Sequence, residues 1–228
     1  PISDSYTDIS LLLMGSGWIF IDRNPTKLTC YTRWMPRQRF DASYYRRFYS
    51  STPVHSRKKV EELAAAVHAM CSWWDVPVKS MLDVGAGLGY WRDWYAKTHP
   101  RIKRLSVDIS EHACGKFGHE QRDISEWRPR IPFDLVVCHG VLQYLTASQA
   151  ERAISNLAAA TRHVLYLEVP TTDDLRHSVD ATSTDLDVHS RSGAWYRKHL
   201  AVHFDQAGAG LWVKRDGAVV LYELERSR

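Results

Sequence analysis

From Ser80 to Pro170 the sequence alternates between short apolar runs and segments with helical spacing. The apolar runs predict strands, and they are SMLDVG, IKRLSVDIS, FDLVVCHG and HVLYLEVP. The segments between them predict helices or, for the second, a short helix or turn: LGYWRDWYAKTH, EHACGKFG and ASQAERAISNLAAAT. Strands that alternate with helices form βαβ units, whose strands pair in parallel through right-handed connections. The pattern therefore predicts an α/β fold with a doubly wound, mainly parallel sheet and helices on both faces.

The C-terminal part departs from this alternation. After a predicted helix over residues 193–208, the segment AGLWVKRDGAVVLYELE holds two β-rich runs on either side of Arg215, Asp216 and Gly217. Asp-Gly between two such runs favours a hairpin. We therefore expect the sheet to end in an antiparallel hairpin strand.

The N-terminal part falls into two segments. Residues 1–34 show no sustained period and predict an irregular appendage, so we place the main domain at residues 35–228. Asp41 is a good N-cap for a first helix, and a second begins at about Ser56 and ends before Pro77. Residues 35–76 thus predict N-terminal helices that cover the sheet as a lid.

Composition narrows the class of protein. The 228 residues are enough for one domain, and a formal charge of +4 does not by itself indicate a nucleic-acid partner. The four cysteines are far apart, which favours neither a zinc knuckle nor a disulfide framework and suits a reducing cytoplasm. The apolar run LLLMGSGWIFI has only 11 residues, whereas a membrane span needs about 20. We expect a cytoplasmic protein with no membrane segment.

A glycine turn follows the first of the four strands, in LDVGAGLG. Gly85, Gly87 and Gly89 allow the backbone to turn sharply and a ligand to approach closely at the carboxyl end of the strand. The spacing is GxGxG and not the GxGxxG of dinucleotide sites, which disfavours an NAD-dependent oxidoreductase. Asp83 would repel a pyrophosphate and attract an amino group.

Two more acids stand at the ends of later strands. Asp108 ends the second strand, 19 residues after Gly89, where an acid accepts hydrogen bonds from ribose hydroxyls. Asp123 stands where the next strand is expected to end and could meet an adenine amino group. The three acids together predict a ligand with an amino acid part, a ribose and an adenine.

The order LDVGAGLG, SVDIS, RDISEW, FDLVVCHGVLQYL and LYLEVP, followed by a terminal hairpin, resembles class I S-adenosylmethionine-dependent methyltransferases. The resemblance covers residues 55–225 and implies a seven-stranded sheet with an antiparallel last strand. It implies that S-adenosyl-L-methionine is the cofactor, with Asp108 at the ribose and Asp123 and Ile124 at the adenine. The other cofactor-binding residues implied are Asp83, Gly85, Ala86, Gly87, Gly89, Ile109, Cys138 and His139.

The acceptor side of such a site needs a group that takes a proton if the acceptor is an oxygen. His139 is the first candidate for this base, and His189, in the polar segment 171–192, is the second. Glu168 would orient a hydroxyl or, as the less favoured alternative, bind a divalent metal together with Asp187 or His189. We predict no metal, because no compact ligand cluster is evident. Tyr44, Tyr45, Tyr144 and Trp195 are the predicted substrate contacts.

The predicted function is methyl transfer to a small-molecule acceptor, with an oxygen as the favoured acceptor atom. A nucleic-acid methyltransferase is the alternative, because eight Lys or Arg residues and several aromatic residues lie between Arg33 and Lys59. The absence of a (D/N)PPY motif and of an RNA-binding domain disfavours it. A second alternative is a protein that binds the cofactor without catalysis. The oligomeric state stays open.

Overall fold

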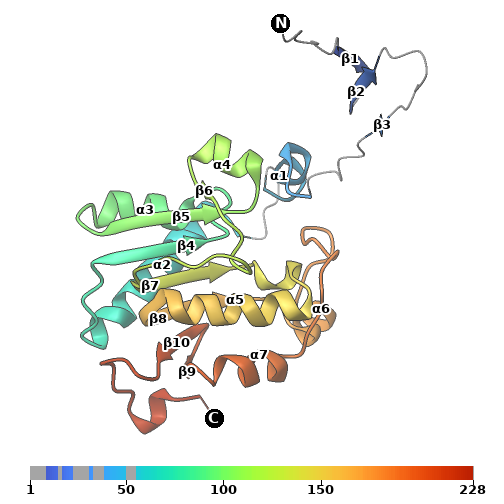
Figure 1. Cartoon of the computed structure of the whole chain (residues 1–228). Helices are drawn as coiled ribbons and strands as arrows, with labels where there is room; N and C mark the ends of the chain where they lie inside the picture. Colours follow the sequence, from blue (N-terminus) through green and yellow to red (C-terminus); the bar gives the residue numbers. More distant parts are fainter. Residues whose placement is uncertain (1–8, 15–16, 23–30, 33–38, 50–54, 228) are drawn as a thin grey trace, which may run out of the picture. The chain divides into compact units, whose positions relative to one another are not determined.

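The structure is a computed structural model that describes residues 9–14, 17–22, 31–32, 39–49 and 55–227 (Figure 1). The chain divides into two compact units, Pro1–Arg39 and Phe40–Arg228. The first unit contains an antiparallel sheet with the order β1-β2-β3, formed by β1 (Ile9–Met14), β2 (Gly17–Asp22) and β3 (Tyr31–Thr32). The expectation of an irregular segment over residues 1–34 therefore needs correction. Gly15 and Ser16 separate two apolar runs, a hairpin pattern that is missed when the runs are taken as one.

The second unit contains a seven-stranded sheet with the order β6-β5-β4-β7-β8-β10-β9. The strands are β4 (Ser80–Val84), β5 (Lys103–Asp108), β6 (Glu120–Gln121), β7 (Phe133–His139), β8 (Thr161–Glu168), β9 (Phe204–Gly208) and β10 (Leu211–Lys214). Strands β4 to β8 pair in parallel, whereas β10 is antiparallel to both β8 and β9. The predicted fold class is confirmed, including its antiparallel end.

The hairpin lies earlier in the chain than predicted. It is formed by β9 and β10, and its turn contains Gly208, Ala209 and Gly210, all with positive φ. The predicted helix over residues 193–208 ends at Leu200. Tyr196, Leu200 and Phe204 are all buried and have helical spacing, which predicts a longer helix. Phe204, however, is the first residue of a strand.

The helices are mostly those predicted, and several of them start at a polar N-cap. Asp41 accepts hydrogen bonds from the N–H groups of Ser43 and Tyr44, and Ser56 caps the second helix. The helices are α1 (Ala42–Tyr49), α2 (Arg57–Trp73), α3 (Tyr90–Thr98), α4 (Glu111–Phe117), α5 (Ala147–Ala160), α6 (Thr172–His177) and α7 (Gly193–Leu200), with 3-10 turns η1 (Leu142–Tyr144) and η2 (Glu223–Glu225). Within the described part of the chain, none of these helices is both long and apolar enough to cross a membrane.

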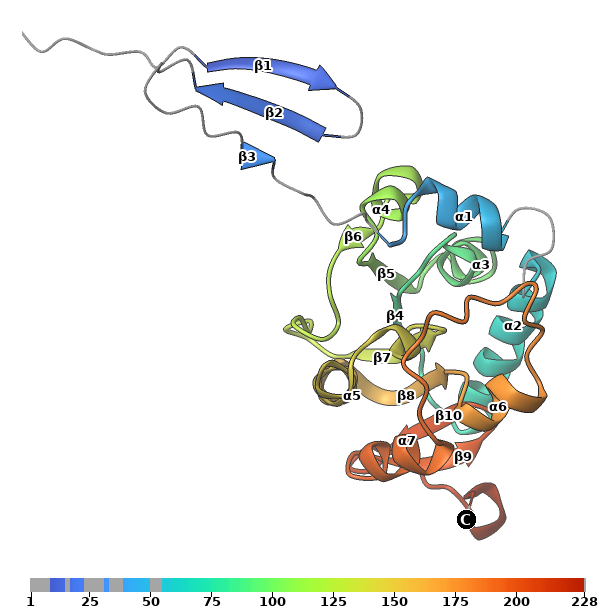
Figure 2. The same ribbon diagram turned by 90° about the vertical axis from the view of Figure 1, so that its right-hand side faces the viewer.

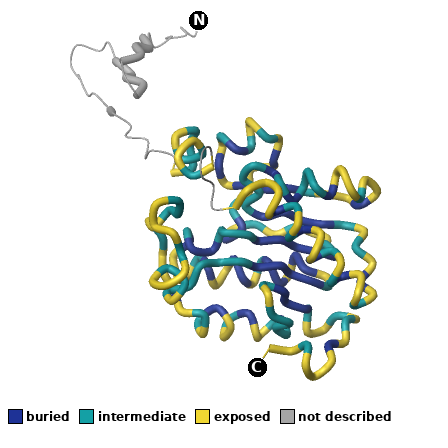
Figure 3. Tube along the Cα trace, turned by 180° about the vertical axis from the view of Figure 1, so that it is seen from behind, coloured by how far each residue is buried: buried dark blue, intermediate teal, exposed yellow. Residues whose placement is uncertain are grey.

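Two apolar clusters fill the space on either face of the sheet. Helices α2 and α3 pack on one face, against Met81, Leu135 and Val137, and α5 and α7 pack on the other, against Leu82 and Val136 (Figure 1). Neighbouring residues of a strand point to opposite faces, so the two clusters divide each strand between them. The central strands are therefore buried along most of their length (Figure 3).

Candidate active site

A cavity of about 820 Å³ lies at the carboxyl ends of β4, β7 and β8. One part of its wall is the glycine turn with the start of α3: Asp83, Gly85, Ala86, Gly87, Leu88, Tyr90 and Trp91. Another part comes from the ends of β7 and β8 and from η1: His139, Gly140, Gln143, Tyr144 and Glu168. The N-terminal helices and the segment after β8 complete it, including Tyr44, Phe48, Tyr49, His55, Asp174, Asp180 and Asp185. This is the position at which doubly wound sheets bind ligands.

The glycine turn is built by the backbone. Gly85, Gly87 and Gly89 have φ angles of 67°, 54° and 77°, a region that favours glycine. The N–H groups of Gly85 and Ala86 both donate to the carbonyl oxygen of Val107, at 2.8 and 3.1 Å. A Cβ atom on Gly85 would lie 2.2 Å from Val141 Cγ2. The turn therefore leaves no room for a side chain at Gly85.

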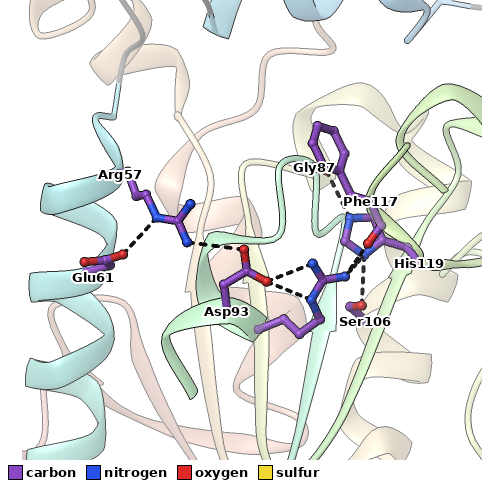
Figure 4. A network of polar contacts seen from close by, with 8 residues as sticks. Arg57, Glu61, Gly87, Asp93, Ser106, Phe117 and His119 are labelled. Carbon is purple, nitrogen blue, oxygen red and sulfur yellow. Dashed lines mark hydrogen bonds and ion pairs between the residues drawn. The ribbon is translucent and has the colours of Figure 1, made fainter. Parts of the chain in front are cut away.

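A polar network holds the turn from behind (Figure 4). Nε2 of His119 lies 3.0 Å from the carbonyl oxygen of Gly87, while Nδ1 lies 3.3 Å from Arg92 Nη1 and 2.8 Å from Ser106 Oγ. Because the guanidinium can only donate, Nδ1 accepts and the proton of the neutral ring sits on Nε2, facing Gly87. Burial lowers the pKa of His119 and favours this neutral form.

Asp83 presents an unsatisfied carboxylate to the cavity. The residue is 2% exposed, and its Oδ2 has no hydrogen-bond partner in the described part of the chain. Burial raises the pKa of Asp83 to about 7, although a hydrogen bond from the backbone of Arg92 acts in the opposite direction. A cationic group of a ligand would complete this site.

Asp108 is buried at the end of β5 and fixes the neighbouring turns. Its two oxygens accept from the N–H groups of Gly87 and Ser110, both at 2.8 Å. Helix α1 packs against this region, since Ser110 Oγ donates to the carbonyl oxygen of Phe40 and the Tyr45 ring lies 5.5 Å from the His112 ring. Figure 2 shows α1 beside α4. Asp108 does not line the cavity in this arrangement.

The remaining residues predicted at the cofactor lie in different environments. Ile109 is 48% exposed, and the Asp123 carboxylate accepts from the N–H of Ser125. The side chains of Ile124 and Cys138 are 4% and 0% exposed and belong to the apolar cluster beneath α5. The structure therefore places the Ile124 and Cys138 side chains in the core and away from the cavity. Cys138 precedes His139 in β7, so its side chain points to the opposite face of the sheet.

The part of the cavity at the ends of β7 and β8 is organised around Glu168. Strands β7 and β8 pair in parallel with His139 beside Glu168. Glu168 Oε1 lies 3.2 Å from His55 Nε2 and 3.4 Å from His139 Nε2, and Oε2 accepts from the Tyr166 hydroxyl at 2.8 Å. Burial alone would raise the pKa of Glu168, but its close contacts with the two histidines and the hydrogen bond from Tyr166 hold that pKa well below its usual range. Glu168 is therefore an ionised carboxylate.

Trp91 determines which nitrogen of the neutral His139 ring carries the proton. The indole Nε1–H of Trp91, whose side chain is buried, donates to His139 Nδ1 at 3.2 Å. The proton of the neutral imidazole is therefore on Nε2, which faces Glu168 without a hydrogen bond of good geometry in the described residues. The nearest atoms of His55, His139 and Glu168 lie within 4.8 Å of one another, but a metal would need Nε2 of His139 free of its proton. In this arrangement the proton on His139 Nε2 occupies the position that a metal ion would need.

Several predicted acceptor residues do not reach this cluster. His189 is exposed and outside the cavity wall, and its backbone N–H donates to the carbonyl oxygen of Gln143. Trp195 stacks on His199, with ring centroids 4.0 Å apart, on the side of α7 away from the cavity wall. Tyr44 and Tyr144 do line the cavity, and their hydroxyls lie 2.8 Å apart. Tyr45 lies next to them on α1 but against α4.

Sequence reasoning did not identify His55, Trp91, Tyr166 and His119 as functional. His55 stands immediately before the N-cap Ser56, a position that carries no motif of its own. Trp91 follows the glycine turn directly, and this proximity is a signal that could have marked it. Tyr166 is two residues before Glu168 on the same strand, so period-2 alternation predicts that both point to one face.

Comparison with known proteins gives a consistent result. Residues 82–163 match a family model described as "Methyltransferase domain". A search of curated protein sequences gives no match. A magnesium protoporphyrin IX methyltransferase from Synechocystis with bound SAH is similar in structure, with a TM-score of 0.51, 18% identity and coverage of 75% of this chain and 93% of the other.

Two further solved structures share the fold. An S-adenosylmethionine-dependent methyltransferase from Clostridium acetobutylicum has a TM-score of 0.54 at 13% identity, covering 76% of this chain and 96% of the other. A plantazolicin methyltransferase, solved in complex with a triazolic desmethylPZN analog and SAH, has the same TM-score at 13% identity, covering 70% of this chain and 66% of the other. At these identities the likeness concerns the fold.

Proposed function

We propose that this chain, which contains a class I S-adenosylmethionine-dependent methyltransferase domain, transfers a methyl group to an oxygen of a small molecule. The observation that carries the proposal is the group at the acceptor end of the cavity, where an ionised carboxylate and two imidazoles meet beside the glycine turn. An oxygen acceptor must lose its proton during transfer, and an imidazole beside the carboxylate could accept that proton.

The residues present fit the cofactor. The unpartnered Oδ2 of Asp83 would bind its ammonium group, and the side-chain-free surface of Gly85 would let the methionine part approach the backbone. Asp108 would bind the ribose. Access to Asp108 would require Phe40 and the α1 helix that follows it to move away from Ser110. When bound, S-adenosylmethionine supplies a methyl group on a positively charged sulfur, which is already a good leaving group.

The protein's own part in the reaction is alignment and proton removal. Backbone contacts at the glycine turn and the wall of the cavity would hold the acceptor in line with the methyl group, which removes the entropic cost of encounter. A histidine next to Glu168 would take the acceptor proton. His139 and His55 are the two histidines in the described cavity wall.

A small-molecule acceptor is supported by the charge of the cavity. Among the described residues that line it there is no Lys or Arg, whereas Asp83, Glu168, Asp174, Asp180 and Asp185 all face it. Such a wall disfavours a polyanionic acceptor. The basic residues of the N-terminal helices, Arg46, Arg47, Arg57, Lys58 and Lys59, are exposed to solvent. Nucleic acid would have to bind by that outer surface.

The test begins with calorimetric titration of the full chain with S-adenosylmethionine, S-adenosylhomocysteine and NAD, beside the variant Asp108→Ala. We expect micromolar binding of the two sulfur compounds, weakened in the variant, and no binding of NAD. Homocysteine release is then measured over a pool of phenols and alcohols and over a pool of RNA. Turnover of RNA alone would favour the nucleic-acid alternative. Binding without turnover of either pool would favour a non-catalytic cofactor-binding protein.

A further inference from the structure

The two imidazoles beside Glu168 differ in what they can still accept. His139 has both ring nitrogens committed: Nδ1 accepts from Trp91 and Nε2 carries the proton that faces Glu168. To take up a second proton, His139 would need one on Nδ1, directly against the indole N–H of a buried tryptophan. Two donors would then face each other, so His139 is poorly suited to accept the proton of a substrate.

His55 has no such restriction. Its Nε2 lies 3.2 Å from Glu168 Oε1, which places the ring proton on Nε2, pointing at the carboxylate. Glu168 is its polar contact in the described part of the chain, so Nδ1 keeps a free lone pair. The ring lines the cavity and its side chain is 43% exposed. Both the acceptor and water can therefore reach it.

We propose that His55 is the catalytic base of this methyltransferase domain, paired with Glu168, and that His139 is a positioning residue that Trp91 holds against the same carboxylate. The inference rests on the proposed function and assigns the proton transfer to a residue outside the strand ends that form the rest of the acceptor site. Helix α2 begins immediately after His55, so its N-terminus brings the base to the site.

The acceptor oxygen forms a bond to the methyl carbon as the bond between that carbon and sulfur breaks, and the electron pair of the broken bond stays on sulfur. The acceptor's proton passes to Nδ1 of His55. The imidazolium that forms is stabilised by the Glu168 carboxylate, and its half-exposed ring then returns the proton to water.

Other ionisable groups face the same space and would contribute to any pH dependence. On the strand ends these are His139 and Glu168, with Asp83 at the glycine turn. The segment after β8 adds Asp174, Asp180 and Asp185, and α1 adds Tyr44 and Tyr49, whose pKa values are raised by burial. His55 must therefore be observed directly and not through activity alone.

The first experiment uses the full chain with ¹⁵N-labelled histidine and saturating S-adenosylhomocysteine. Two-bond ¹⁵N–¹H spectra report which ring nitrogen of each histidine carries the proton, and His55→Gln and His139→Gln each remove one set of peaks for assignment. We expect the neutral His55 ring to carry its proton on Nε2, facing Glu168, and this preference to weaken in Glu168→Gln. His139 should carry its proton on Nε2 as well, with Nδ1 accepting from Trp91, and should keep this tautomer in Glu168→Gln.

Several outcomes of these spectra would overturn the proposal. One is a neutral His55 with its proton on Nδ1, or a His55 whose spectrum does not respond to Glu168→Gln. Another is stoichiometric binding of added Zn²⁺ with loss of the Nε2 proton of His139, which would make the cluster a metal site.

Kinetics on an acceptor found in the hydroxyl pool test the role itself. His55→Gln keeps a donor toward Glu168 but cannot take a proton, so kcat should fall by roughly 10²- to 10⁴-fold with little change in KM and should recover partly at higher pH. His139→Gln, the matched variant, should lower kcat by less than about tenfold, because it removes only the orienting contact. The reverse order would overturn the assignment. If the wild type methylates no hydroxyl compound, the proposed function fails, while the spectra still decide whether His55 is paired with Glu168.

Discussion

Asp83 and Glu168 stand at opposite ends of one cavity, and their environments shift their pKa values in opposite directions. Burial raises the pKa of both carboxyls, yet Asp83 ends at about 7 while Glu168 falls well below its usual range. Asp83 has an oxygen without a partner, whereas two histidines and Tyr166 surround Glu168. Polar contacts with neighbouring side chains, more than burial, therefore set the charge of these two carboxyls. Oδ2 of Asp83 has no partner among the described residues until a cation binds, whereas Glu168 already has three polar neighbours.

The largest effect should come from filling the backbone cradle of the cofactor end. Gly85→Ala brings a Cβ to 2.2 Å from Val141 at a positive φ. We expect cofactor affinity to fall at least 100-fold and the free energy of unfolding to drop by about 3 kcal/mol, from strain and overpacking. Calorimetric titration and urea unfolding measure both quantities.

Gly115→Ala is the matched control for this substitution. Gly115 lies inside α4, and a Cβ there would meet nothing within 4 Å. Affinity should stay within about twofold, and stability should stay level or rise by up to about 1 kcal/mol. Equal losses in the two variants would show that the cradle at Gly85 is not a binding surface.

Asp83→Asn should separate binding from stability at the cofactor end. Removal of the charge should weaken S-adenosylmethionine binding roughly 10- to 100-fold, the usual value of a charge-assisted hydrogen bond. Stability without ligand should rise. The folded pKa lies above the unfolded value, so the folded state binds more protons and the wild type loses stability as pH rises from about 4 to about 7.

The gain in Asp83→Asn over the wild type should therefore be greatest above pH 7 and vanish below about pH 4. Thermal unfolding of both proteins over this range measures it. A constant difference at every pH would mean that the pKa of Asp83 is the same in the folded and unfolded states, and the comparison with Glu168 would fail.

Glu168→Gln should show the opposite pH dependence. The folded pKa of Glu168 lies below its unfolded value, so its contribution to stability is fully present above about pH 4.5 and is lost as pH falls through the folded pKa. The variant should therefore be less stable than the wild type at neutral pH, by a modest amount because the side chain is 42% exposed. The two proteins should converge in acid. A variant that is more stable at neutral pH would contradict the pairing with the histidines.

The smallest effect should be at His119, behind the glycine turn. Its folded pKa is lowered, so the unfolded state binds more protons below about pH 6.5 and stability falls as pH falls through that region. His119→Ala should lose this dependence and weaken cofactor binding several-fold. His119→Gln should lose the pH dependence but keep a donor to Gly87, and with it most of the affinity. His68 and His203 have pKa values lowered in the same direction, and comparison with the wild type cancels their contribution.

The cofactor end could be predicted from the sequence because local signals specify it. A strand, three glycines with positive φ and a helix are contiguous in the chain, and Asp83 and Asp108 end neighbouring strands. The sheet follows from the same alternation. The hairpin was misplaced because Asp216-Gly217 has the residues of a turn, whereas the turn that forms uses Gly208, Ala209 and Gly210, where Gly210 packs under Tyr166.

The acceptor end could be predicted only in part, because its side chains come from segments far apart in the chain. His139 and Glu168 were identified, since both end strands that the pattern placed side by side. His55 was not, because its approach to Glu168 depends on how α2 packs on the sheet, and no local pattern encodes that packing. His189 was chosen for its place in a polar segment, but the segment turns its side chain to solvent.

Trp91 also gives this protein a built-in optical probe. Its indole is 4% exposed, lines the cavity, donates to His139 and lies 5.2 Å from the Tyr166 ring. Indole emission responds to the polarity and protonation of its neighbours, so a ligand that enters the cavity should change the fluorescence of this residue. The difference spectrum between the wild type and Trp91→Phe would isolate it from the eight other tryptophans, of the nine in the chain. Ligand arrival could then be followed in a stopped-flow instrument without any label.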